Sequence, residues 1–256
     1  DPESGPYIPK VRELLFQGKY REAQKLANDN IMNAQHGMPY QPVGNLHINF
    51  PGQANFSDYY RDLDIEKAIS SVSYSVDGIK YKREVFSSFT DDVIIMKVSA
   101  DKPEQINCEL YFTSPQSHSE EYNKNKIILA GKSGGREGIE GKVKFETQVK
   151  PILEGGSVAV KDTSIVIKNA DAVKFYISIG TNFENYKDLV ADQEKNASSP
   201  LQAAIKKDYE KARQEHIQHY QNYFNRVKLD LGATDVAHKP TDVRIENYPE
   251  GYDPNL

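Results

Sequence analysis

The sequence predicts a mainly β protein: an antiparallel β-sandwich (a super-sandwich) with an N-terminal helical hairpin and a long C-terminal linker helix. Residues 9–32 carry apolar side chains at helical spacing. Between residues 43 and 181 the period changes to two, and a helical stripe returns after Pro200. Because short turns, and no alternating helices, join the strand segments, antiparallel pairing is favoured over a parallel sheet.

The N-terminal segment predicts two short helices. Apolar residues recur three or four positions apart up to Gly18, and the same spacing resumes at Tyr20 and continues to Met32. We therefore expect a helical hairpin over residues 9–32 with its turn at Gly18.

The middle of the chain predicts about ten strands. The Asp77-Gly78 pair is a typical two-residue hairpin turn. Cys108 shares a strand face with apolar neighbours, which makes it a small core residue. The glycine-rich segment 131–141 reads as a long connection. The expected strands cover residues 43–50, 72–76, 79–83, 93–98, 106–112, 126–130, 142–150, 157–161, 163–168 and 172–180.

A long helix is expected to begin at Pro200, with one apolar stripe that includes Leu201, Ile205 and Phe224. Residues 233–256 are polar, contain several prolines and carry no packing pattern. We therefore divide the chain into a sandwich domain, 1–198, and a helical linker, 199–256.

Composition excludes several classes of protein. A single cysteine rules out an internal disulfide and a multi-cysteine metal site. No run of about 18 apolar residues is present, so no transmembrane helix is expected. The net charge of −5, without a basic cluster, argues against nucleic acid as a partner. We expect neither a cofactor nor a metal.

Catalytic patterns are weak in this chain. The acid pairs Asp62/Asp64, Asp91/Asp92 and Glu120/Glu121 have the composition that a glycosidase needs, but solvated acids in turns are the ordinary interpretation. His216 and His219 are three residues apart on the expected helix, without a carboxylate at a matching spacing for a metal. No catalytic residue is therefore predicted in this chain.

The segment 36–44 is a better candidate for binding. It carries the imidazole of His36, the phenol of Tyr40 and the amide of Gln41, and two prolines stiffen it. These groups hydrogen-bond to and stack on sugars. The competing interpretation is a structural loop that attaches the helical hairpin to the sheet.

Several segments together resemble the N-terminal region of glycoside hydrolase family 95, the inverting α-L-fucosidases. They occur in family order and cover nearly the whole chain. The matching segments are Leu14–Ala23, Met38–Leu46 (MPYQPVGNL), Tyr60–Ile65, Tyr81–Ser88, His216–Val227, Leu229–Gly232 and Pro240–Arg244. His219 departs from the family, which usually has an acid before the helix tyrosine.

The resemblance implies a sandwich and linker that precede an (α/α)6 barrel, with a glutamate acid and the water-activating residues in that barrel. This chain alone is then expected to be inactive and to begin inside its domain. His36, Tyr40 and Gln41 are expected to form one wall of the pocket for the oligosaccharide substrate. The resemblance also implies a bacterial enzyme exported to the periplasm or the cell surface.

Three alternatives stay open. One is a related enzyme of the same architecture, an α-galactosidase or a family 65-type phosphorylase. Another is a non-catalytic carbohydrate-binding sandwich, disfavoured by the absence of tryptophan but kept open by 16 tyrosines. The last is a helical-repeat adaptor, for which one hairpin is too little.

Overall fold

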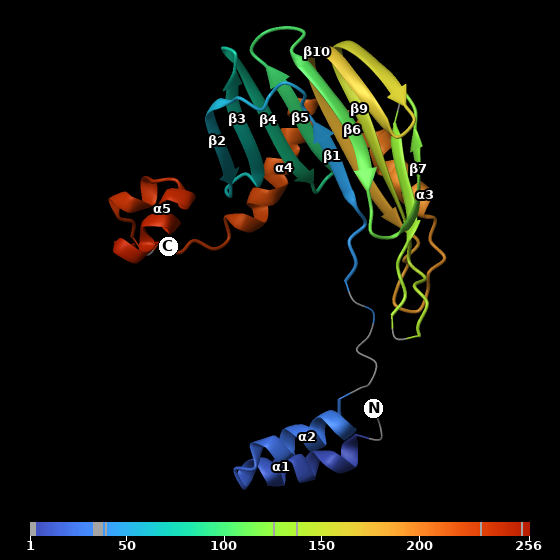
Figure 1. Cartoon of the computed structure of the whole chain (residues 1–256), viewed down its shortest axis with the longest axis vertical. Coiled ribbons are helices and arrows are strands. Elements are labelled where there is room, and N and C mark those ends of the chain that lie inside the picture. The colour runs from blue at the N-terminus through green and yellow to red at the C-terminus, as the bar shows by residue number, and fades with distance from the viewer. Residues whose placement is uncertain are drawn as a thin grey trace.

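The computed structural model describes residues 4–32, 38, 40–124, 126–136, 138–230, 232–251 and 253–256. These residues form a ten-stranded antiparallel sheet that folds into two layers (Figure 1). The larger layer has the strand order β2-β3-β4-β5-β10-β9-β8-β7, and the smaller layer adds β1 and β6 to β10. The strands are β1 (Asn45–Asn49), β2 (Ser57–Asp64), β3 (Ile69–Val76), β4 (Ile79–Ser88), β5 (Val93–Ala100), β6 (Ile106–Thr113), β7 (Ser117–Tyr122), β8 (Ile127–Lys132), β9 (Lys144–Lys161) and β10 (Ser164–Thr181).

The hairpin of β9 and β10 belongs to both layers. Residues 172–177 of β10 pair with β5, whereas residues 165–170 pair with β6. The register shifts between Ile167 and Ala170, and such a bulge bends a strand. Gly156 lies opposite this bend with φ +71°, and a Cβ there would be 2.4 Å from the carbonyl oxygen of Lys168. Glycine is thus required where the hairpin bends from one layer into the other.

The main core fills the space between the two layers. Phe175, Leu110 and Ile127 are fully buried there. Cys108 is buried in the same cluster, and this burial raises the pKa of its thiol to about 12. The expectation that Cys108 is a small core residue is therefore confirmed.

Two helices, α3 (Gln193–Ala204) and α4 (Tyr209–Phe224), cover the outer face of the larger layer (Figure 1). Their apolar residues form a second core with Phe86 and Ile95 of the sheet. The expectation of one helix beginning at Pro200 is corrected: Pro200 lies inside α3. The carboxylates of Asp192 and Asp208 cap the two helices separately.

The predicted helical hairpin is confirmed as α1 (Ile8–Phe16) and α2 (Tyr20–Asn30), with the turn at Gly18. The C-terminal tail is more ordered than its composition suggests. It contains α5 (Thr241–Asn247), and Arg244 donates two hydrogen bonds to the carboxylate of Asp253, of 2.7 and 3.0 Å. Short 3-10 helices cover Gly5–Tyr7, Asp235–His238 and Tyr248–Glu250. Within the described residues, no helix is both long and apolar enough to span a bilayer.

Strands β2 and β7 were not expected from the sequence. Both lie at edges of the larger layer and are mostly exposed, so their residues do not alternate between apolar and polar. Asp62, Asp64, Glu120 and Glu121 therefore lie in strands or at a strand end rather than in turns. Four of the expected strands merge into two long ones. The segments 142–150 and 157–161 belong to β9, and the segments 163–168 and 172–180 belong to β10.

Candidate functional site

Several loops meet at one end of the sandwich, which we call the loop end. The strand registers bring them together, because β1 begins beside the end of β6 and β9 begins beside the ends of both β8 and β10. Figure 1 shows these segments below the sheets. The loop end comprises residues 40–44, 114–116, 133–136, 138–143 and 182–192.

Gln41 ties the segment that precedes β1 to the glycine-rich connection. Its Oε1 accepts a hydrogen bond from the backbone N–H of Gly134 at 2.7 Å, and its Nε2 donates to the carbonyl of Gly134 at 3.1 Å. The side chain thus pairs with both backbone groups of one residue, much as a neighbouring strand would. Gln41 is a positioning residue for the loop around Gly134.

Gln116 and Ser114 fix the same segment from the β6–β7 turn. The Nε2 of Gln116 donates to the carbonyl of Pro42 at 3.1 Å, and its Oε1 accepts from the N–H of Gly134 at 3.0 Å. Ser114 Oγ donates to the carbonyl of Val43 at 2.6 Å. Side chains therefore satisfy the backbone groups that a neighbouring strand would otherwise pair with, and they join the segment before β1, the β6–β7 turn and the connection around Gly134.

Asn182 has the corresponding role for the loop after β10. Its Oδ1 accepts from the N–H of Lys144 at 2.7 Å, while its Nδ2 donates to the carbonyls of Lys142 and Leu189. Asn182 is buried, so these bonds are shielded from water. The loop end is consequently held in one arrangement.

Large exposed side chains project from the hydrogen-bonded loops of the loop end. Tyr40 is 97% exposed and Tyr186 is 84% exposed. Phe183, Ile139 and Val190 are also exposed. A rigid frame with exposed rings can stack on a ligand or pack against a further domain.

The predicted binding residues have different positions. His36 lies outside the described residues. Tyr40 projects into solvent, whereas both ends of the Gln41 amide bond to protein backbone. Their contact with substrate stays a prediction. Gln116 and Asn182 could not be found from the sequence, because an amide that bonds to distant backbone leaves no periodic pattern.

Most of the predicted acids are engaged by neighbouring side chains. Asp64 pairs with Lys67 at 2.5 Å, and Glu120 accepts from Tyr122 at 2.7 Å. Burial would raise the pKa of Asp91, but hydrogen bonds from Lys207 and Ser88 outweigh it and lower that pKa. Asp91 and Asp92 do lie in a turn, as expected.

The two helix histidines pack among aromatic rings. His216 is buried against Phe86, and its Nε2 lies 3.1 Å from the carbonyl oxygen of Ala68. His219 contacts Phe89 and Tyr223. Among the described residues, no group of three or more histidines, cysteines or acids could hold a metal ion.

Two segments of the chain match models of known families. Residues 2–186 match the family model described as glycosyl hydrolase family 65, N-terminal domain. The chain belongs to this family. Residues 208–256, which include α4 and the tail, match the model of the glycosyl hydrolase family 95 catalytic domain. The resemblance drawn from the sequence is thus confirmed at the level of the family: the chain carries a glycosyl hydrolase family 65 N-terminal domain and matches part of the family 95 catalytic-domain model.

Relatives agree with this assignment. An Arabidopsis thaliana protein named alpha-L-fucosidase 2 is 28% identical over 97% of this chain and 33% of its own length. A protein of Aspergillus niger named probable alpha-fucosidase A is 26% identical over 96% of this chain and 32% of its own length. The chain therefore spans about a third of these plant and fungal relatives.

Among solved structures, a protein described as a kojibiose phosphorylase from the human microbiome overlaps 70% of this chain and 27% of its own. The TM-score is 0.48 and the sequence identity is 12%. At this TM-score the overlap supports no conclusion about function.

Proposed function

We propose that this chain is the non-catalytic N-terminal part of an α-L-fucosidase that removes terminal α-linked fucose from oligosaccharides with inversion. The observation that carries the proposal is the 28% identity to alpha-L-fucosidase 2 of Arabidopsis thaliana over 97% of the chain. In this proposal, catalysis belongs to an (α/α)6 barrel in the parent enzyme. An inverting reaction needs an acid and a base about 6.5–9.5 Å apart across one sugar bond.

The loop end is proposed to form one wall of the substrate pocket. The hydrogen bonds that hold its loops support this role, because a group whose position is fixed before the ligand binds loses less conformational entropy on binding. Tyr40 supplies an exposed ring, and Gln41 holds the loop around Gly134. His36 is proposed to contribute from the same segment.

The test is fucose release from an α-1,2-fucosylated oligosaccharide. We expect the full-length parent to release fucose, first as the β-anomer seen by proton NMR, and this chain alone to release none. An α-galactoside is assayed in parallel, and phosphate is added to a further sample. Fucose release by these 256 residues alone would contradict the assignment of catalysis to the barrel.

Two related activities are outcomes of the same assay. Cleavage of the galactoside in place of the fucoside would identify an α-galactosidase of the same architecture. Cleavage that needs phosphate and yields a sugar phosphate would identify a phosphorylase. Among the alternatives, a family 65-type phosphorylase agrees best with the family model that matches the sandwich.

A substitution at Tyr40 tests the wall in the parent enzyme. Tyr40→Ala is expected to raise KM about threefold to tenfold with a small change in Tm, because the side chain is 97% exposed and makes few contacts to lose. Tyr20→Ala is the matched control, since Tyr20 is 67% exposed on α2. Equal kinetics for both variants would remove Tyr40 from the pocket.

Gln41→Ala is expected to act through the loop. Removing the amide leaves the Gly134 carbonyl without its donor and leaves the Gly134 N–H with Gln116 alone, so the loop loses part of its attachment. We expect KM to rise in the parent while kcat changes less, and Gln41→Glu to rescue only in part because a carboxylate cannot donate to the Gly134 carbonyl. Unchanged KM in Gln41→Ala would argue that the loop makes no contact with substrate.

Bacterial origin and export to the periplasm or cell surface also belong to the proposal. They follow from the resemblance to the family. Fractionating the source cells and following the parent enzyme by immunoblot would test export directly.

A further inference from the structure

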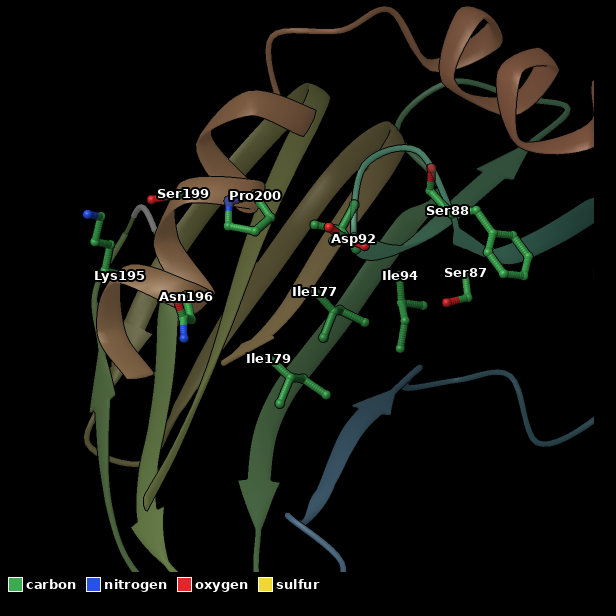
Figure 2. A pocket seen from close by; sticks show the side chains of 12 residues that line it. Ser87, Ser88, Asp92, Ile94, Ile177, Ile179, Lys195, Asn196, Ser199 and Pro200 are labelled. Carbon is green, nitrogen blue, oxygen red and sulfur yellow. The ribbon is translucent and has the colours of Figure 1, made fainter. Parts of the chain in front are cut away.

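A hollow of about 780 Å³ opens between the β4–β5 turn, the end of β10 and α3 (Figure 2). It lies beside the loop end, because β5 begins next to the last residues of β10. Figure 2 shows Ile94, Ile177 and Ile179 on the strands, with Asn196, Ser199 and Pro200 on the helix. Aliphatic and polar groups therefore line the same space.

One aromatic ring at this hollow is held firmly and is still accessible. Phe89 lines the hollow and remains 59% exposed. Its ring stacks on His216 at a centroid distance of 6.1 Å and an interplanar angle of 11°, and also contacts His219 and Tyr220. These contacts come from α4 and fix the ring before any ligand binds.

Polar groups line the hollow on two walls. Asp92 follows Asp91, whose carboxylate is held by Lys207 and Ser88. On the opposite wall, Asn196 Nδ2 donates to the carbonyl of Thr181 at 3.0 Å, so the amide has a defined orientation. The amide on the helix wall is thus oriented without a ligand, while the Asp92 side chain is exposed in the β4–β5 turn.

We propose that this hollow binds one or two neutral sugar residues of an oligosaccharide, with the apolar face of a pyranose ring on Phe89 and hydroxyls of the bound sugars at Asp92 and Asn196. A carboxylate and an amide together accept from and donate to neighbouring hydroxyls. The hollow carries one acid, Asp92, and one base, Lys195, so it does not favour a charged ligand. The oligosaccharide class rests on the proposed function.

The test uses this chain and ligand-observed saturation-transfer NMR. The probes are an α-1,2-fucosylated oligosaccharide and an α-galactoside. Phe89→Ala is expected to weaken binding about tenfold, and Asp92→Asn by a smaller factor. Phe16→Ala is the matched control, because Phe16 is 86% exposed on α1. Phe89→Tyr keeps a ring on the platform and is expected to bind like the unmodified chain.

The outcomes separate the two proposals. No binding of either probe by the unmodified chain, or equal binding by Phe89→Ala and Phe16→Ala, would overturn the site. Binding that is lost in Tyr40→Ala and kept in Phe89→Ala would place the sugar at the loop end and also overturn it. Binding of the galactoside alone, lost in Phe89→Ala, would support the hollow while it contradicts the fucosidase assignment. Should Phe89→Ala fail to fold, a loss in Asp92→Asn with retention in Phe89→Tyr still supports the site.

Discussion

Replacing Glu84 by alanine is expected to lower the free energy of unfolding by about 3 kcal/mol and to release α4 from the sheet. The Glu84 carboxylate is buried at the outer face of β4. It accepts hydrogen bonds from the hydroxyl of Tyr209 at 2.7 Å and from Nε of Arg213 at 2.6 Å. Both donors belong to α4, so removing one carboxylate leaves a buried phenol and a cation without their acceptor.

The same contact gives a pH dependence with a definite sign. Burial alone would raise the pKa of Glu84, but the hydrogen bonds from Arg213 and Tyr209 outweigh it and hold that pKa below its usual 4.5. The unfolded chain then binds the proton more readily than the folded chain. The stabilisation is therefore complete above about pH 4.5 and is lost as the pH falls through the lower, folded-state pKa.

Urea unfolding between pH 3 and 7 measures both effects. Glu84→Ala should reduce the acid sensitivity as well as the stability at neutral pH, and hydrogen exchange should show loss of protection in α4. Lys82→Ala is the control, since Lys82 lies 3.4 Å from the same carboxylate but is mostly exposed. Equal losses in the two variants would show that the contacts with α4 carry little energy.

The sequence predicted the layers and the core better than the edges. Alternation identified β3, β4 and β6 because one face of each is buried, and it identified Cys108 as a core residue. Strands β2 and β7 escaped because an edge strand exposed on both faces has no alternation to detect. A second helix, α4, begins after the N-cap residue Asp208. The apolar stripe continues across this boundary, so the pattern predicted one helix where the structure has two.

The candidate sites were less predictable for a different reason. Segment 36–44 was noticed for its composition, but the function of Gln41 depends on Gly134, a residue 93 positions away. The hollow joins the β4–β5 turn to α3, and Phe89 and Asn196 become neighbours of one space only after the sheet has formed. No local pattern can indicate such a pairing, because tertiary contacts alone create it.

Gly180→Ala is expected to displace α3 and to cost about 3 kcal/mol, at the upper end for overpacking. Gly180 is buried near the end of β10, where α3 crosses the sheet. A Cβ there would lie 2.4 Å from the carbonyl oxygen of Gln193 and 2.5 Å from the backbone nitrogen of Ala197. These are backbone atoms of a helix, which cannot yield by changing a rotamer.

Two measurements check this prediction. The urea midpoint of Gly180→Ala should fall, while Gly5→Ala should leave it nearly unchanged because a Cβ at Gly5 meets nothing within 4 Å. Moving α3 also displaces Asn196 and Lys195, which line the hollow together with Phe89, so sugar binding at the hollow should weaken in samples that remain folded. An unchanged urea midpoint would contradict this prediction. It would mean that α3 can shift on the sheet with little loss in the free energy of unfolding, so that the contact between α3 and the sheet contributes less stability than its burial suggests.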